Sequence, residues 1–414
     1  MHRKDFINIL LITTALGIPS ASLAEGGDMA FSVAGDGLWN AYAPASHSLV
    51  SSLDNMGAMA FELGHDRLGM AERDANARLT YLATAGLALA FFNRANSIFF
   101  GHEGSHFHFA HLTGRTEHRF VDHDDQSTVS YLDAYMRSLW SGQTKASAAS
   151  KSPDASASDP VEIMWANNAG VNWQMAHSEI VMRENLLAGE GRITNAMPYL
   201  YNRFYPSFYA LRDLKNDDDS GDLIDFRDWL ESQHGEKDSL EKIATYSLIA
   251  MLASPATIDA ATAGQDYVYG GELSYRPFGI DMGQGASLSW DIPTYANAMN
   301  FTIVPTVYLR SQGALADKFG ADSVVLGAGI EFAVLGEDAQ ELSAYGAARW
   351  GKLSGEVELA AGDGSYASLG LSYEVSDILS LDLAAMHADG ASLRGKRNLP
   401  QGGDQVWLGL SVNF

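Results

Sequence analysis

The stretch from Tyr267 to the C-terminus contains about nine runs in which apolar residues alternate with small or polar ones. Turns rich in Gly, Asp and Pro separate these runs, and Leu369-x-Leu371-x-Tyr373-x-Val375 is one example. Successive side chains of a β-strand point to opposite faces, so each run predicts a strand with one apolar face. We therefore expect residues 263–414 to form an antiparallel β-barrel of about eight to ten strands.

The alternation alone does not say whether the apolar face meets lipid or a buried core. Transmembrane barrel strands show it, and so do the strands of a water-soluble antiparallel barrel or sandwich. The last run ends on Phe414, which resembles the C-terminal signature of bacterial outer-membrane barrel proteins. That resemblance implies a location in the outer membrane of a Gram-negative cell, in contact with its lipid.

The N-terminus has the three parts of a secretory signal peptide. His2-Arg3-Lys4 is basic, Phe6 to Ile18 is apolar, and Ser22-Leu23-Ala24 supplies small residues for cleavage. An uncleaved anchor is the alternative, but the apolar run is shorter than the ~20 residues that a spanning helix needs. We expect residues 1–24 to be removed and the protein to be exported.

The segments before the predicted barrel have helical patterns. We expect a helical domain over residues 25–140 and a further helical region over residues 161–262. A Ser- and Ala-rich stretch, residues 141–160, separates the two regions and predicts a flexible linker. The whole chain is therefore expected to be an α+β protein.

The formal net charge is −24, which argues against nucleic acid or an anionic lipid surface as a partner. The chain has no cysteine, so a metal ion must be held by His, Asp or Glu.

One short motif carries recognisable chemistry. Residues 101–106 read Gly-His-Glu-Gly-Ser-His, which contains the pattern H-E-x-x-H. On a helix, His102 and His106 lie on one face and can bind one metal ion, with Glu103 beside it. The alternatives are a polar helix without a metal or, because His106-Phe107-His108-Phe109 alternates with a period of two, a histidine-rich surface strand.

This motif resembles that of the zincin metallopeptidases. The resemblance implies Zn²⁺ held by His102 and His106, with Glu103 as the general base for a metal-bound water. Phe109 and Leu112 stand where the longer metzincin motif has Gly and His, so the gluzincin arrangement fits better. That arrangement implies a third ligand from a later helix, and Glu179 is favoured over His177 and Glu184. Arg183 follows Glu179 by four residues, in place of the acidic residue usual in that family.

An acidic segment, residues 217–228, is similar to an EF-hand calcium loop. Asp217, Asp219, Asp225 and Asp228 fall on ligand positions, but Asp222 stands where the sharp-turn glycine belongs. The alternative is an acidic turn that caps a helix.

Taken together, these features predict an exported zinc metallopeptidase associated with the outer membrane, with a protein or peptide as substrate. The alternative is a non-enzymatic outer-membrane barrel protein with a His-rich segment that binds a divalent metal. A hydrolase acting on peptidoglycan or lipid would share the same metal chemistry.

Overall fold

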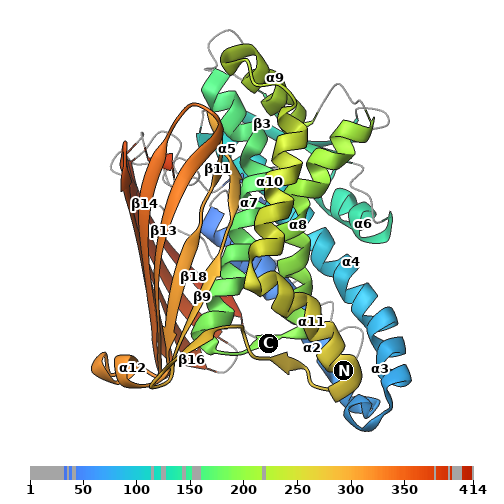
Figure 1. The fold of residues 1–414 in the computed structure, drawn as a ribbon. Helices are drawn as coiled ribbons and strands as arrows, with labels where there is room; N and C mark the ends of the chain where they lie inside the picture. The colour runs from blue at the N-terminus through green and yellow to red at the C-terminus, as the bar shows by residue number, and fades with distance from the viewer. Residues whose placement is uncertain are drawn as a thin grey trace.

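The fold is that of a computed structural model, which describes residues 32–34, 37–39, 43–112, 116–122, 127–141, 146–151, 160–216, 221–376, 379–389, 392–393 and 403–412. Helices dominate the first two thirds of the chain (Figure 1). They are α2 (Ala43–Arg67), α3 (Ala75–Tyr81), α4 (Leu87–Asn96), α5 (Glu103–Leu112), α6 (Tyr131–Ser141), α7 (Pro160–Ala188), α8 (Ile193–Asn216), α9 (Asp222–His234), α10 (Ser239–Ala253), α11 (Pro255–Gly270) and the short α12 (Ala314–Lys318). Two π-helical segments, Leu82–Gly86 (η2) and Ser97–His102 (η3), join α3, α4 and α5 into one nearly continuous helical run.

Helix α8 is central to the helical part and packs against α7, α10 and α11. Tyr199 of α8 and Tyr267 of α11 are fully buried in the main apolar core, together with Phe61 of α2. Pro255 has no amide hydrogen to continue α10, so the chain bends there, and the axes of α10 and α11 differ by 66°. Among the described helices, none alone is long and apolar enough to span a membrane; α10 and α11 meet those two conditions only as this bent pair.

Most of the remaining chain forms one antiparallel sheet of eleven described strands. They are β8 (Ile280–Gly283), β9 (Ala286–Asp291), β10 (Thr294–Ala296), β11 (Asn300–Ile303), β12 (Thr306–Ser311), β13 (Ser323–Gly336), β14 (Gln340–Trp350), β15 (Leu353–Gly362), β16 (Ser365–Ser376), β17 (Leu379–Ala388) and β18 (Gly403–Val412). Strands β12 to β18 pair in sequence order, and β9 and β8 continue the sheet beyond β12. The long β13 also pairs with β11 past the end of β12.

Small strands lie outside this sheet. They are β1 (Ser32–Ala34), β2 (Gly37–Trp39), β3 (Thr116–Asp122), β4 (Thr128–Val129), β5 (Ala146–Lys151), β6 (Gly191–Arg192) and β7 (Ser274–Tyr275). Strand β5 pairs with β3, so part of the segment predicted to be a flexible linker is a strand in the structure.

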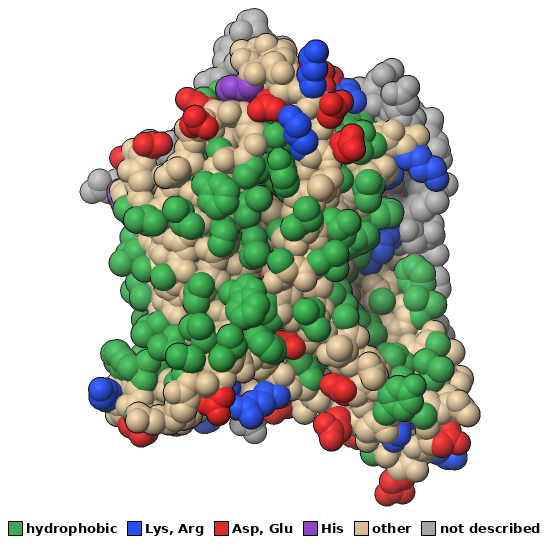
Figure 2. All heavy atoms as spheres, viewed as in Figure 1, with side chains coloured by type: hydrophobic (Ala, Val, Ile, Leu, Met, Phe, Trp, Pro, Cys, Tyr) green, Lys and Arg blue, Asp and Glu red, His purple; other side chains and the backbone are tan. Residues whose placement is uncertain are grey.

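The two faces of the large sheet differ in polarity. On the outer face, Leu369, Leu371, Tyr373 and Val375 of β16 are each at least 38% exposed. The register sets Leu369 opposite Val357 of β15. It sets Leu371 opposite the exposed Leu383 of β17, so apolar side chains of neighbouring strands lie side by side. Figure 2 shows hydrophobic side chains across the middle of one face of the molecule, with most of the charged ones at its upper and lower ends.

The inner face of the sheet, which packs against α7, combines apolar and charged side chains, and Tyr308, Val325 and Tyr345 belong to the main apolar core. Arg183 of α7 makes ion pairs with Glu179 and with Glu358 of β15, the latter at 2.9 Å. The guanidinium of Arg183 also lies over the ring of Tyr345, 4.2 Å from its centroid. The strands therefore carry exposed apolar side chains away from the helices, whereas the face toward α7 holds both apolar core residues and a charged group.

The predicted α+β arrangement, helices first and a large antiparallel sheet last, is confirmed. Over the described residues the sheet has eleven strands rather than eight to ten. Within the described residues no pairing joins β8 to β18, so the structure does not show the sheet closed into a barrel.

Candidate metal centre

The H-E-x-x-H motif is helical. His102 ends the π-helical segment η3 and His106 lies in α5, so the alternative of a strand is wrong. The Nε2 atoms of the two imidazoles are 3.3 Å apart, which is the one-face placement that the spacing predicts. A π-helical turn inside a longer helix is frequent at functional sites.

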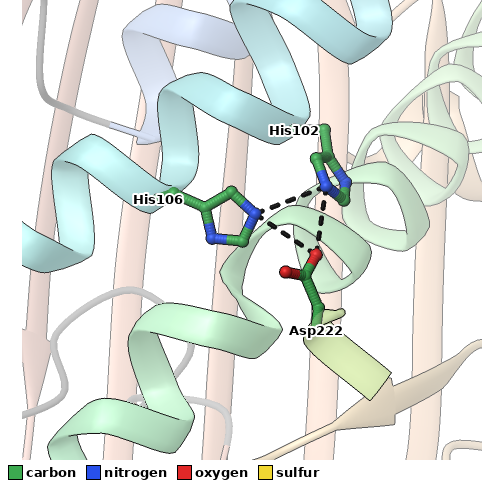
Figure 3. A group of neighbouring side chains, drawn as sticks. All are labelled: His102, His106 and Asp222. Carbon is green, nitrogen blue, oxygen red and sulfur yellow. Dashed lines mark hydrogen bonds and ion pairs between the residues drawn. The ribbon is translucent and has the colours of Figure 1, made fainter. Parts of the chain in front are cut away.

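Asp222, the first residue of α9, completes the group (Figure 3). Its Oδ2 lies 3.1 Å from Nε2 of His102 and 3.3 Å from Nε2 of His106. Three potential ligand atoms from two distant parts of the chain therefore converge on one point. Asp222 is also the residue that departs from the EF-hand pattern.

Helix α7 fixes the orientation of both imidazoles. Nδ1 of His106 donates to the carbonyl oxygen of Ala166 at 2.6 Å, and Nδ1 of His102 donates to Oε1 of Gln174 at 3.2 Å. Since Nδ1 carries the hydrogen in both rings, each Nε2 can offer its lone pair to a metal ion. This second layer of contacts is typical of histidine ligands.

Two glycines allow α7 to approach the motif. A Cβ atom on Gly170 would lie 2.4 Å from Nδ1 of His102, and one on Gly101 would lie 2.1 Å from the ring of Trp173. Neither position has room for a side chain. The close crossing of η3 and α7 therefore depends on these two glycines.

The charges in the group are strongly coupled. Burial alone would lower the pKa of His106, but the charges of Asp222 and Glu103 raise it to about 9. Burial would raise the pKa of Asp222, yet the two imidazoles hold it well below its usual range. Oδ2 of Asp222 is buried and lies within ion-pair distance of both Nε2 atoms. A buried carboxylate oxygen between two imidazole nitrogens is a donor set that suits coordination to a cation.

Glu103, the predicted general base, is buried beside the group at 7% exposure. Its charge contributes to the raised pKa of His106, so its carboxylate is within electrostatic reach of that imidazole.

Glu179 does not join the two imidazoles. Its carboxylate is bound by Arg183 and accepts hydrogen bonds from Tyr295 at 2.7 Å and Tyr308 at 3.4 Å, on the inner face of the sheet. Helix α7 passes the site near Gly170, and at 1.5 Å per residue Glu179 lies roughly 13 Å further along the axis.

The two reserve candidates also lie elsewhere on α7. His177 stacks on Trp173, with ring centroids 4.8 Å apart, and burial lowers the pKa of His177 to about 4. Burial, with the charge of Glu356, raises the pKa of Glu184 to about 7.

The calcium prediction falls partly outside the described residues, which exclude Asp217 and Asp219. Asp225 accepts a hydrogen bond from Nδ2 of Asn167 at 2.8 Å, and Asp228 pairs with Arg227 at 2.7 Å. Both lie on α9. Among the described residues of this acidic segment, Asp222 is the one that lies against His102 and His106.

Aromatic residues of α8 complete the surroundings. The rings of Tyr205 and Tyr209 lie 5.5 and 6.1 Å from the ring of His102. Burial, reinforced by the charge of Asp222, raises the pKa of both hydroxyls well above the usual value, so both stay protonated. No local sequence pattern links these tyrosines to the histidines.

A cavity of about 250 Å³ lies beside α7. Trp165, Asn297, Asn300 and Glu337 line it, and none of the three candidate ligands does.

Comparison with protein-family models, with curated proteins and with solved structures finds no match to this chain. The function must therefore be argued from the site itself.

Proposed function

We propose that this protein is a zinc-dependent hydrolase, with a peptide bond as the first candidate for the bond that it cleaves. His102, His106 and Asp222 would hold the ion. The observation that carries the proposal is the spacing of the three ligand atoms, 3.1 to 3.3 Å. A tetrahedral zinc with bonds of about 2.0–2.1 Å separates its ligand atoms by roughly 3.3 Å.

The donor set also suits catalysis. Three protein ligands leave the fourth position of a tetrahedral ion open, as in catalytic rather than structural zinc sites. A bound zinc ion acidifies a water molecule and polarises a carbonyl group. Glu103 would take the proton of that water and pass it to the leaving amine. The rings of Tyr205 and Tyr209 lie beside His102, and their protonated hydroxyls would be the donors for the reacting carbonyl oxygen.

Zinc content and hydrolysis, measured together, test this proposal. Wild type and the variants His102→Ala, Asp222→Asn and Glu103→Gln would be purified, supplied with zinc and assayed with fluorescent casein. We expect the first two variants to lose both zinc and activity, and Glu103→Gln to keep zinc and lose activity. Glu179→Gln is the matched carboxylate control and should keep its zinc. A wild type that takes up no zinc would refute the proposal.

A non-enzymatic role is the second candidate. His102 is only 4% exposed and Glu103 only 7%, and neither of the described cavities opens onto the ligands. Those features favour a stored or structural ion. Under this alternative Glu103→Gln would change nothing, whereas a hydrolase requires that carboxylate.

We also propose that the large sheet lies in an outer membrane. Its support is the apolar outer face of the sheet, because the solvent-facing side of a water-soluble antiparallel sheet is mainly polar. The predicted signal peptide agrees with this location. Fractionation of cells that express the chain tests it: the protein should stay in the outer-membrane fraction after a carbonate wash, and release by that wash would contradict it.

A further inference from the structure

Helix α8 carries an apolar stripe next to its metal-facing side. Phe204, Phe208 and Leu211 follow one another at spacings of four and three residues, so they share one helix face. They are 39%, 52% and 47% exposed. Tyr205 and Tyr209, which flank His102, each come one residue later and therefore face about 100° around the same helix. One helix thus separates the metal ligands from an exposed apolar surface.

The helices that pack on α8 also expose apolar side chains. Ile249 and Leu252 of α10 and Ile258 of α11 are 57–60% exposed. Single exposed apolar residues are ordinary on soluble proteins, but contiguous patches over several elements mark a surface that meets something apolar. Figure 2 shows the hydrophobic side chains of one face continuing from the strands onto the neighbouring helices.

Charged residues are missing from these helix segments. The sequence from Ile243 to Ile258 contains no Asp, Glu, Lys or Arg. On α8 the only charged residue from Ile193 to Leu211 is Arg203, which is buried and paired with Asp291 at 2.7 Å. A helix face that only had to tolerate water would not need to exclude charge over such lengths.

Charge returns where the metal group lies. Arg212 and Lys215 end α8, and α9 begins with Asp222 and carries several further acidic and basic residues. The ligand Asp222 therefore stands at the boundary between the uncharged stretch and a charged end of the molecule. In a bilayer such a boundary coincides with the membrane–water interface.

We infer that the exposed faces of α8, α10 and α11 lie against lipid acyl chains beside the sheet, and that the metal group acts at the membrane surface on a polypeptide anchored in the same bilayer. The first half rests on the exposed stripe and the missing charges. The choice of substrate rests on the hydrolase proposed above. Continuity with the apolar outer face of the sheet favours lipid over a protein partner on the helices.

Spin labels on single cysteines test the lipid contact, because the chain has no cysteine of its own. Phe208→Cys and Leu252→Cys would be labelled in the full-length protein, reconstituted into vesicles of phosphatidylethanolamine and phosphatidylglycerol. We expect both labels to collide more often with oxygen, which concentrates in lipid, than with a water-soluble nickel chelate. Leu371→Cys on the outer face of the sheet serves as the reference.

Two controls fix the interpretation. Lys215→Cys on the same helix and Gln233→Cys on α9 should show the reverse preference, since both are exposed at the charged end. A nickel preference at positions 208 and 252 would overturn the inference, and so would shielding from both reagents, which signals a protein partner or a second copy. Unchanged zinc content would show that each variant is folded.

The substrate is tested with one fluorescent casein peptide in two forms, free and tethered to the vesicles by a palmitoyl chain. We expect the tethered form to be cleaved at least ten times faster, and Phe208→Ser with Leu211→Ser to remove that advantage but not the basal rate. Equal rates would overturn the choice of an anchored substrate. If neither form is cleaved while the labels report lipid, the hydrolase fails but the lipid contact stands. Release of fatty acid from the vesicles without peptide cleavage would mean that the substrate is lipid, and would overturn the choice of a polypeptide.

Discussion

Gly170 of α7 lies directly against the imidazole of His102. A methyl group at position 170 would be 2.4 Å from Nδ1 and 2.5 Å from Cε1 of that ring. The position of the first candidate ligand is therefore set by the absence of a side chain on another helix. Gln174, one turn further along α7, then accepts the hydrogen bond from Nδ1.

Replacing Gly170 by Ala should damage the metal centre. The new methyl group must displace either His102 or α7, and a shift of a few tenths of an ångström moves Nε2 away from Asp222. We expect the affinity for zinc to fall on the order of 10- to 100-fold, as when other partners that orient a ligand are lost. Competition with a fluorescent zinc chelator measures the change.

Gly264→Ala is the matched control for Gly170→Ala. Gly264 is also inside a helix, α11, but a Cβ there would meet only Leu82, at an ordinary 3.7 Å. We expect unchanged zinc affinity and a gain of about 0.4–1 kcal/mol in the free energy of unfolding. Equal zinc affinities for Gly170→Ala and Gly264→Ala would show that the contact with His102 does not position a ligand.

Asp222→Asn should weaken zinc binding more than any change in the surrounding layer. The amide keeps the shape of the side chain but removes the charge that balances the cation. We expect a loss larger than the roughly 10- to 100-fold typical of partners outside the ligand set. Asp225→Asn, one turn away on α9, removes the same charge from a residue that contacts Asn167 instead, and should keep wild-type affinity. Isothermal titration of both metal-free variants with zinc measures the two affinities. Equal affinities would show that Asp222 is not a ligand.

The sequence predicts the histidine pair because the two residues are one helical turn apart, which is a local relationship. It predicts the alternating strands for the same reason, since a period of two residues is visible within each strand. Asp222 joins His102 only through the packing of α9 against α7, and nothing local distinguishes it among 51 acidic residues. Glu179 has the expected chemistry, but α7 carries it past the site to Arg183 and the sheet.

The short strands at the start of the sheet could not be predicted from local sequence patterns either. The extra strands come from the region between α11 and β12, where short segments such as β10 and β11 pair beside β13. Their pairing depends on the part of the long β13 that extends beyond the end of β12. No periodicity in the sequence encodes that difference in length.

The metal-free protein should lose stability as the pH rises. The pKa of His106 is raised from 6.5 to about 9, so its contribution to stability is complete below pH 6.5 and disappears as the pH rises through 9. The difference in pKa corresponds to about 3 kcal/mol at most. Urea unfolding at pH 6 to 10 measures this slope.

Zinc should abolish that loss, because the ion replaces the proton in the group. In the zinc-loaded protein we expect a flat profile over the same range of pH. The apparent affinity for zinc should correspondingly rise between pH 7 and 9 and then level off. A pH-independent affinity would mean that His106 does not release a proton when the metal binds.

A charge on the outer face of the sheet distinguishes lipid from water. Leu369 lies midway along β16, is 46% exposed, and sits in a row with Val357 of β15. In water, Leu369→Arg would be an ordinary surface change within about 0.5 kcal/mol. At the middle of a bilayer the same change costs about 2–4 kcal/mol. Gln340→Arg, exposed at the first position of β14, places the same charge at the end of a strand, where the cost in a bilayer falls to about 0–1 kcal/mol. We expect Leu369→Arg alone to unfold at lower urea concentration in phospholipid vesicles. Equal stability of the two variants would place this face in water.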